Sequence, residues 1–257
     1  MAAPAELTLR ALDGVPMVKA GDDLAGIILD AVSAASLALQ ARDVVVLAQK
    51  IVSKAEGRLI ELRGIEPSAK AVEIAAQSDK DPRVVQLILD ESDEVLRVRP
   101  GAVIVGHRLG FVAANAGIDQ SNIGNGNDDD RVLLLPLDPD GTCDRLRAEL
   151  KTRTGIDVAV VIIDSIGRAW RNGTVGTAIG VSGMAGLLDL RAKPDLFGRP
   201  LKTSELGLAD ELASAASLVM GQSSEGRPIV LARGVPYARR DGNAHELIRP
   251  KEIDLFR

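Results

Sequence analysis

Short apolar runs alternate with amphipathic stretches along the chain, and this pattern predicts strands and helices in turn. The apolar runs at residues 43–49 and 158–163 are typical of strands that are buried on both faces. The second of these runs is the most apolar in the chain and is expected to end at Asp164. Amphipathic stretches at 24–40 and 205–220 predict two helices. Asp22 or Asp23 can cap the first, and Ser204 the second.

Further strands and helices are expected between these segments. Strands are predicted at 6–12, 58–62, 95–98, 102–105, 111–114, 131–135 and 229–232. Helices are predicted at 67–77, 82–90 and 143–152, the last closed by Gly155. Several neighbouring strands lie close enough in sequence to form hairpins. The predicted fold class is therefore α/β, with mixed sheets flanked by helices rather than a purely parallel sheet.

Length and composition are those of an ordinary globular protein. The 257 residues are 46% hydrophobic and 2% aromatic, so the core must consist of Val, Ile, Leu and Ala. We expect a single domain over 1–257, and a division into two subdomains near 130–155 remains open. The sequence lacks the motif Gly-x-x-x-x-Gly-Lys-Ser/Thr, and no predicted strand is followed by Gly-x-Gly-x-x-Gly. This disfavours P-loop and Rossmann nucleotide sites.

Charge and targeting signals exclude several classes of partner. The net charge of −5 gives no general attraction for nucleic acid or an anionic membrane, so a phosphate ligand would have to be held locally. There is no signal peptide and no apolar window long enough to span a membrane, which favours a cytoplasmic protein. Cys143 is the single cysteine and is expected to be buried. His107 and His245 lack partners at triad or metal-ligand spacing, which indicates structural or surface roles.

Two short segments offer carboxylates for a divalent cation. Asp119 and Asn122 lie in a polar loop at 117–130 that follows a predicted strand. The alternative for this loop is an ordinary Asp/Asn turn. Asp164 and Ser165 follow the apolar run at 158–163, where α/β sheets commonly bind ligands. Their oxygen atoms suit Mg²⁺ or Mn²⁺, although a solvated strand end is an equally good interpretation.

Three further segments could contact an anion. Lys50 and Lys54 follow a buried strand and could hold phosphate, although most lysines are simply surface residues. The glycine-rich stretch at 167–186 could point backbone N–H groups at an anion, or it could be a set of turns. Trp170 within it could pack on the neighbouring arginine stems. The polar loop at 220–227 could line a ligand, or Gly221 could simply end a helix.

These segments together resemble the coenzyme F420:L-glutamate ligase family. The resemblance extends over nearly the whole chain, and its motifs occur in the family's order. They are Val15-Pro16-Met17-Val18, Gly21-Asp22-Asp23-Leu24, Ile51-Val52-Ser53-Lys54-Ala55-Glu56-Gly57-Arg58, Ala114-Asn115-Ala116-Gly117-Ile118-Asp119-Gln120-Ser121-Asn122, Asp164-Ser165-Ile166-Gly167-Arg168, Arg171-Asn172-Gly173, Ala178-Ile179-Gly180 and Asp254-Leu255-Phe256-Arg257. Several motifs in the right order make a more specific signal than any one of them alone.

The resemblance implies an acid–amino-acid ligase that uses GTP, two divalent cations (Mg²⁺ or Mn²⁺) and one K⁺ ion, and that forms a homodimer. Carried over to this sequence, Asp119 and Asp164 would bind one divalent ion, and Ser165 and Gln222 the other. GTP would be surrounded by residues from several segments. They are Val15, Pro16, Met17, Val18, Lys50, Lys54, Asn122, Met220, Gly221, Gln222, Ser223, Ser224, Glu225, Gly226 and Arg227.

The sequence also departs from the family pattern. The family leads us to expect Thr at Ser165, Pro at Ala169 and Ser at Gln49. Ser165 keeps the hydroxyl that can bind a metal. Gln49 replaces the serine expected there, so the contact of that serine with the nucleotide would have to be made by an amide. The flavin-binding C-terminal domain of some family members has no counterpart in this sequence.

The resemblance implies transfer of L-glutamate, through its amino group, to a carboxylate of coenzyme F420-0. Whether more than one glutamate is added stays open. A carboxylate must first be phosphorylated by GTP, because its own leaving group is poor. Cations that clamp phosphate oxygens and positioning of the reactants would supply the catalysis, without a Ser or Cys nucleophile. The alternatives are a regulatory GTP-binding protein and a metal-dependent nucleotide hydrolase.

Overall fold

A central mixed sheet of five strands organises the computed structural model, which describes residues 6–121, 123 and 130–254. Its strand order is β1 (Thr8–Ala11), β12 (Ile229–Arg233), β2 (Val44–Ala48), β8 (Ala159–Arg168) and β9 (Arg171–Ser182). The inner pair β2–β8 is parallel, with Val44 opposite Ala159 and Ala48 opposite Ile163. The other neighbours are antiparallel. The prediction of a mixed α/β sheet is confirmed.

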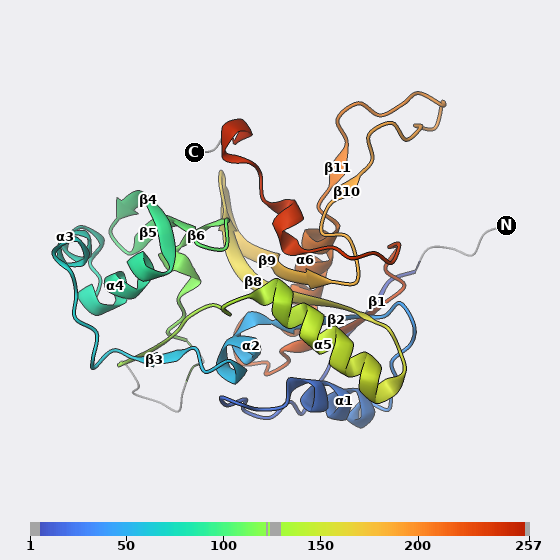
Figure 1. Cartoon of the computed structure of the whole chain (residues 1–257), viewed down its shortest axis with the longest axis horizontal. Coiled ribbons are helices and arrows are strands. Elements are labelled where there is room, and N and C mark those ends of the chain that lie inside the picture. The colour runs from blue at the N-terminus through green and yellow to red at the C-terminus, as the bar shows by residue number, and fades with distance from the viewer. Residues whose placement is uncertain (1–5, 122, 124–129, 255–257) are drawn as a thin grey trace.

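Helices cover both faces of this sheet (Figure 1). Helices α1 (Leu24–Ala34), α2 (Gln49–Ala55) and α5 (Pro139–Thr154) pack with one cluster of buried residues, and α6 (Leu208–Met220) packs with the other. Side chains alternate between the two faces along each strand. Along β2, Val45 and Leu47 belong to the first cluster, whereas Val44 and Val46 belong to the second. Burial on both faces explains why β2 and β8 begin as uninterrupted apolar runs.

A third hydrophobic cluster lies beside the central sheet and forms a separate lobe in Figure 1. It contains α3 (Ala69–Ser78), α4 (Pro82–Asp90) and an antiparallel sheet of β4 (Ser92–Arg99), β5 (Ala102–His107) and β6 (Val112–Ala114). The antiparallel pair β3 (Leu59–Glu61) and β7 (Arg131–Leu133), whose strands enter and leave the lobe, connects it with the main sheet. Its buried residues run from Leu62 to Leu134. The division into subdomains near 130–155 stays a prediction.

An arm extends from the body of the molecule at β10 (Leu188–Asp189) and β11 (Glu205–Leu206) (Figure 1). Its tip carries Leu196 and Phe197, which are strongly exposed. The remaining elements are short 3-10 turns, η1 (Asn115–Gly117), η2 (Ala244–Leu247) and η3 (Lys251–Ile253). Among the described helices, none is long and apolar enough to cross a membrane.

Three helix predictions were wrong at their boundaries. The helix predicted at 143–152 begins four residues earlier, at Pro139, because Asp138 caps it there. The first helix ends at Ala34 rather than near residue 40, because Ser36 turns into the left-handed region with φ 55°. The predicted cap is confirmed, since Asp23 accepts a hydrogen bond from the Gly26 N–H. The helix predicted at 205–220 starts at Leu208, because residues 205–206 pair in the arm. Gly207, and not Ser204, therefore occupies the N-cap position.

Two further predictions missed the length or type of an element. Strand β8 does not end at Asp164 but continues to Arg168, paired throughout with β9. The glycine-rich stretch at 167–186 is mostly strand β9 and not a loop. No helix was predicted between the strands at 43–49 and 58–62, so α2, which follows β2 directly, was missed. That missed helix positions the candidate site.

Candidate active site

The parallel pairing of β2 and β8 brings two candidate segments side by side. Ala48 lies opposite Ile163, so the next residues on each strand, Gln49 and Asp164, emerge at the same end of the sheet. The carboxyl ends of parallel strands are where α/β sheets commonly bind ligands. Because α2 begins at Gln49, the helix also carries Lys50 and Lys54 at this edge.

The lobe supplies a second carboxylate through the segment that follows η1. Asn115 and Ala116 have positive φ angles of 53° and 52°, which turn the chain sharply after β6. The Asn115 side chain holds this turn by accepting a hydrogen bond from the Val103 N–H, at 3.0 Å. Asp119 then exchanges two backbone hydrogen bonds with Leu133, at 3.0 and 2.9 Å. These bonds fix Asp119 at the edge of the cavity.

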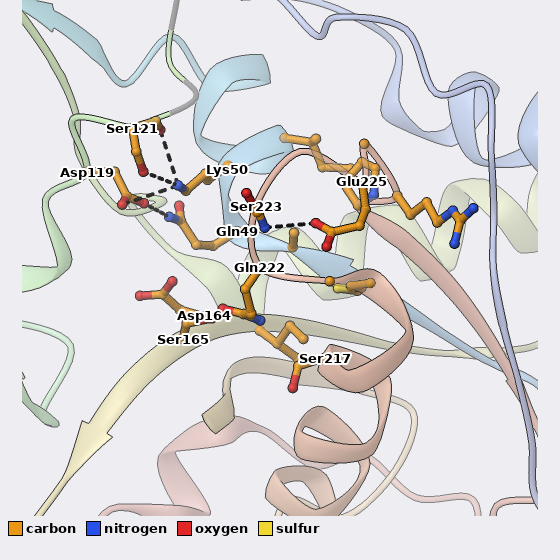
Figure 2. Close-up of a pocket in the computed structure, with 18 of the residues that line it drawn as sticks. Gln49, Lys50, Asp119, Ser121, Asp164, Ser165, Ser217, Gln222, Ser223 and Glu225 are labelled. Carbon is orange, nitrogen blue, oxygen red and sulfur yellow. Dashed lines mark hydrogen bonds and ion pairs between the residues drawn. The ribbon is translucent and has the colours of Figure 1, made fainter. Parts of the chain in front are cut away.

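Polar side chains of α2 meet Asp119 directly (Figure 2). The Gln49 Nε2 donates a hydrogen bond to Asp119 Oδ2 at 2.9 Å. The Lys50 Nζ lies 3.3 Å from Asp119 Oδ1 and donates to the Ser121 hydroxyl at 3.1 Å. Asp164 points toward this group from strand β8 below it. The structure therefore gathers two carboxylates and a lysine that lie far apart in sequence.

The charges of this group are only partly balanced. Burial, and then repulsion from Asp119, raises the pKa of Asp164 to about 6, although Lys50 and Gln49 oppose this rise. Burial also raises the pKa of Asp119, against the opposing effects of Lys50 and Gln49. Burial, and then the charge of Lys50, lowers the pKa of Lys54. Two carboxylates that resist ionisation side by side will be stabilised by a cation between them.

The loop after α6 forms the opposite wall (Figure 2). The Ser165 hydroxyl donates a hydrogen bond of 2.6 Å to Gln222 Oε1, and the Ser223 N–H donates one of 2.8 Å to Glu225. Gly221 lets the chain leave the helix with φ 79°, and a Cβ there would lie 2.2 Å from the Glu225 side chain. This residue is a helix end, as the simpler interpretation predicted, and it also shapes the cavity wall.

All described residues that the sequence nominated as metal or nucleotide ligands line one cavity of about 710 Å³. They are Val15, Pro16, Met17, Val18, Lys50, Lys54, Asp119, Asp164, Ser165, Met220, Gly221, Gln222, Ser223, Ser224, Glu225, Gly226 and Arg227. Asn122, which was also nominated, lies outside the described residues. The volume is that of a site for a sizeable small molecule.

The donor set fits a hard divalent cation. Asp119 and Asp164 offer carboxylate oxygens, and Ser165 and Gln222 offer a hydroxyl and an amide oxygen beside them. Mg²⁺ prefers such ligands and commonly takes the rest of its coordination from water and substrate phosphates. Within the described residues, no group of three or more His, Cys, Asp or Glu side chains gathers as a metal site. These residues would therefore hold a metal together with a phosphate-bearing ligand.

Other candidates from the sequence do not reach the cavity as ligands. Two glycines of β9 serve close packing, since a Cβ on Gly176 would lie 2.3 Å from the Ala213 carbonyl oxygen and one on Gly180 2.7 Å from Pro139. Trp170 is 89% exposed at the β8–β9 turn, so the expected packing on arginine stems was wrong. Cys143 is buried, as predicted, and His107, for which a structural or surface role was expected, is buried as well.

Sequence reasoning missed how several cavity residues take part. Ser121 and Ser217 line the cavity, but no motif distinguished them from ordinary surface serines. Gln49 was treated as a doubtful nucleotide contact, whereas the structure turns its amide toward Asp119. The sequence did contain one indication of this role. Gln49 follows directly after a strand that is buried on both faces, and residues at that end of a strand commonly line a ligand-binding site.

The segment of the chain that contains the cavity residues matches a family of known proteins. A match to the F420-0:Gamma-glutamyl ligase family covers residues 14–234. The chain belongs to this family. The matched segment includes every residue that lines the cavity, from Val15 to Pro228. The resemblance inferred from the sequence motifs is thereby confirmed.

Several relatives carry the name coenzyme F420:L-glutamate ligase. The protein of that name from Methanothermobacter thermautotrophicus is 46% identical over 253 residues, which are 98% of this chain and 99% of the relative. That of Methanocaldococcus jannaschii is 46% identical over 84% of each chain. That of Archaeoglobus fulgidus is 41% identical over 96% of this chain and 94% of its own length. The similarity therefore extends over almost the full length of these ligases.

Proposed function

We propose that this protein is a GTP-dependent ligase that joins the amino group of L-glutamate to a carboxylate of coenzyme F420-0. The products are the amide, GDP and phosphate. The observation that carries this proposal is the gathering of Asp119, Asp164 and Lys50 at one end of a large cavity, with Asp119 paired to Lys50. Membership of the family, and the shared name of relatives that match nearly the full chain, supply the substrate class.

The chemistry requires two successive transfers. An oxygen of the acceptor carboxylate attacks the γ-phosphorus of GTP, the bond to the β-phosphate oxygen breaks, and GDP leaves. The glutamate amine then attacks the carbonyl carbon of the acyl phosphate, loses a proton and expels phosphate. Both steps bring several negative groups together, so positive charge and positioning supply most of the catalysis.

The chain's own residues can meet these demands at separate points of the cavity. Lys50 and Lys54 extend from α2 toward the same space and can bind phosphate oxygens. The loop at 220–227 and the segment at 15–18 can enclose the nucleoside. Asp119 and Asp164 would hold one divalent ion, and Ser165 and Gln222 the second. Bound there, Mg²⁺ or Mn²⁺ would neutralise the phosphate charge that builds up as the leaving group departs.

The family resemblance also leads us to propose a bound K⁺ ion and a homodimer. We assign no K⁺ site among the described residues, so the proposal of a K⁺ ion is based on the family resemblance alone. Sedimentation equilibrium tests the dimer. We expect a species of twice the 27.1 kDa chain mass at micromolar concentration, and a purely monomeric protein would contradict the proposal.

Product analysis tests the ligase activity. The purified protein is incubated with GTP, Mn²⁺, L-glutamate and F420-0, and both the deazaflavin mass and GDP are measured. We expect one GDP for each new amide, and no GDP when the deazaflavin is left out. GDP formed without the acceptor would indicate a hydrolase instead. Nucleotide binding without any GDP would indicate a regulatory GTP-binding protein. A parallel reaction with ATP tests the choice of nucleotide.

A further inference from the structure

Gln49 is a buried amide that touches the candidate metal ligand Asp119. It is the first residue of α2 and only 1% exposed. Its Nε2 donates to Asp119 Oδ2 at 2.9 Å, and its Oε1 accepts a hydrogen bond of 2.8 Å from the Ser53 hydroxyl. Ser53 lies one helical turn further along α2 and is fully buried. The three side chains thus form a continuous chain of hydrogen bonds.

Only one orientation of the Gln49 amide satisfies both neighbours. An ionised carboxylate can only accept hydrogen bonds, so the amide must turn its nitrogen toward Asp119. Its oxygen then faces Ser53, whose hydroxyl can rotate to donate. The reversed amide would place its oxygen against a carboxylate oxygen and leave Asp119 without this donor. Asp119 therefore selects the orientation of the amide, and the hydrogen bond from Ser53 anchors the amide oxygen at its other end.

This arrangement gives the two oxygens of Asp119 different roles. Oδ2 accepts a hydrogen bond from the buried Gln49 amide, whereas Oδ1 lies 3.3 Å from the Nζ of Lys50, whose side chain is partly exposed. We propose that Gln49, anchored by Ser53, is a positioning residue that fixes the plane of the Asp119 carboxylate and presents Oδ1 to a divalent cation. The inference rests on the proposed function, because it requires a metal at Asp119.

A neutral donor is well suited to this task. An amide fixes a carboxylate by hydrogen bonding without adding a positive charge that would repel the cation. Hydrogen bonds from residues behind a metal ligand generally orient it, and their loss weakens metal affinity roughly 10- to 100-fold. A merely space-filling role for Gln49 would predict no such loss, since an apolar side chain of similar size would fill the same space.

The test compares Mn²⁺ binding by Gln49→Met, Ser53→Ala and the double variant with that of the wild-type protein. Free Mn²⁺ is followed by its electron paramagnetic resonance signal at a fixed GDP concentration. Met keeps most of the volume of Gln but removes the donor. Gln86→Met is a matched control, because the Gln86 amide on α4 also joins two partners, the Ser68 N–H and the Asp90 carboxylate, far from the cavity.

We expect Gln49→Met to bind Mn²⁺ roughly 10- to 100-fold more weakly, and Ser53→Ala about twofold to tenfold more weakly. The double variant should be no weaker than Gln49→Met, since Ser53 acts only through Gln49. Gln86→Met should match the wild type. In turnover assays the variants should need more Mn²⁺ but recover near-normal kcat at saturation, which a general structural defect would not produce.

The outcomes separate this inference from the proposed function. Wild-type affinity in both Gln49→Met and Ser53→Ala would overturn the inference alone, because the wild-type protein would still bind metal and nucleotide. Additive losses in the double variant would also overturn it. Failure of the wild-type protein to bind Mn²⁺ with nucleotide would instead overturn the proposed metal centre itself. Should Gln49→Met not fold, Ser53→Ala and the control decide the question.

Discussion

Two clusters of charged residues around carboxylates, one in the lobe and one at the cavity, differ in how the negative charge is balanced. In the lobe, Glu91 is 8% exposed and each of its oxygens has an arginine partner. Arg58 lies 2.7 Å from Oε1, and Arg108 lies 3.0 Å from Oε2. The two guanidinium groups also donate to the carbonyl oxygens of Leu135 and Leu137. This cluster ties the lobe to the chain entering α5, and the protein's own cations neutralise the carboxylate.

At the cavity the balance is incomplete. Asp119 is shared between Lys50 and the neutral Gln49, and Asp164 has no ion pair among those found in the described residues. Burial first, and the Asp119 charge second, raises the pKa of Asp164 to about 6. A carboxylate matched by arginines stabilises the fold, whereas carboxylates that lack positive charge beside a cavity favour binding of a cation. The difference separates a structural cluster from a candidate metal centre.

Removing either cavity carboxylate should give the largest effect. Asp119→Asn and Asp164→Asn keep the side-chain shape but remove the charge that would hold a divalent ion. We expect ligase activity to fall by about a thousandfold or more, equivalent to roughly 4 kcal/mol. Stability without metal should be unchanged or higher, because a repelling charge is lost. Steady-state turnover and urea unfolding measure the two effects. Near-normal turnover at limiting metal in either variant would remove that residue from the proposed site.

Glu91→Gln should lower the stability of the protein without weakening metal binding, which is the opposite of the effect expected for the cavity aspartates. It leaves two half-buried arginines without their shared carboxylate, which should lower the free energy of unfolding by about 3 kcal/mol. We place the effect at the low end because Arg108 is about a quarter exposed. Metal affinity of the folded protein should not change. Urea unfolding and Mn²⁺ titration check both parts. Lost metal affinity with intact stability would reverse the roles assigned to the two clusters.

The lobe should also account for part of the protein's sensitivity to acid. Burial, and then the charge of Arg108, lowers the pKa of His107 to about 4 in the folded protein. The unfolded chain has the higher pKa and binds the proton first, so stability is lost as pH falls from about 6.5 toward 4. Between pH 7 and pH 5 this loss should be about 2 kcal/mol.

The pH dependence of urea unfolding tests the role of His107. His107→Phe removes the titrating group and keeps a ring against Phe111, on which the imidazole stacks at 5.2 Å. The variant should therefore show a smaller loss of stability over this pH range. An equal loss in both proteins would assign the acid sensitivity to other groups.

Replacing the cavity lysines should give the smallest effect. Lys50→Met and Lys54→Met keep the aliphatic stem but remove the charge. A charge-assisted contact contributes about 1.5–3 kcal/mol, so GTP affinity should fall roughly tenfold or more. Lys70→Met on the exposed surface of α3 is a control that should not change binding. GTP affinity is measured by calorimetry. Unchanged affinity in both cavity variants would contradict a phosphate-binding role and would indicate that these lysines are ordinary surface residues.

The sequence predicted most elements because their patterns are local. The run at 44–48 is apolar on both faces, and Pro82 marks the start of α4 at the predicted residue. The cavity needed long-range information. Asp119 and Asp164 appeared as separate candidates, and only the β2–β8 register and the Asp119–Leu133 bridge bring them together. The extension of β8 beyond Asp164 was hidden because its pairing partner β9 is rich in glycine.

The most direct test of the proposed metal centre is the number of Mn²⁺ ions bound per chain in the presence of GDP, measured by equilibrium dialysis. We predict about two ions for the wild-type protein and for folded Glu91→Gln. Asp119→Asn and Asp164→Asn should each bind at least one ion fewer at the same free Mn²⁺ concentration. Wild-type stoichiometry and affinity in both aspartate variants would contradict the assignment of this cavity as a metal-dependent active site.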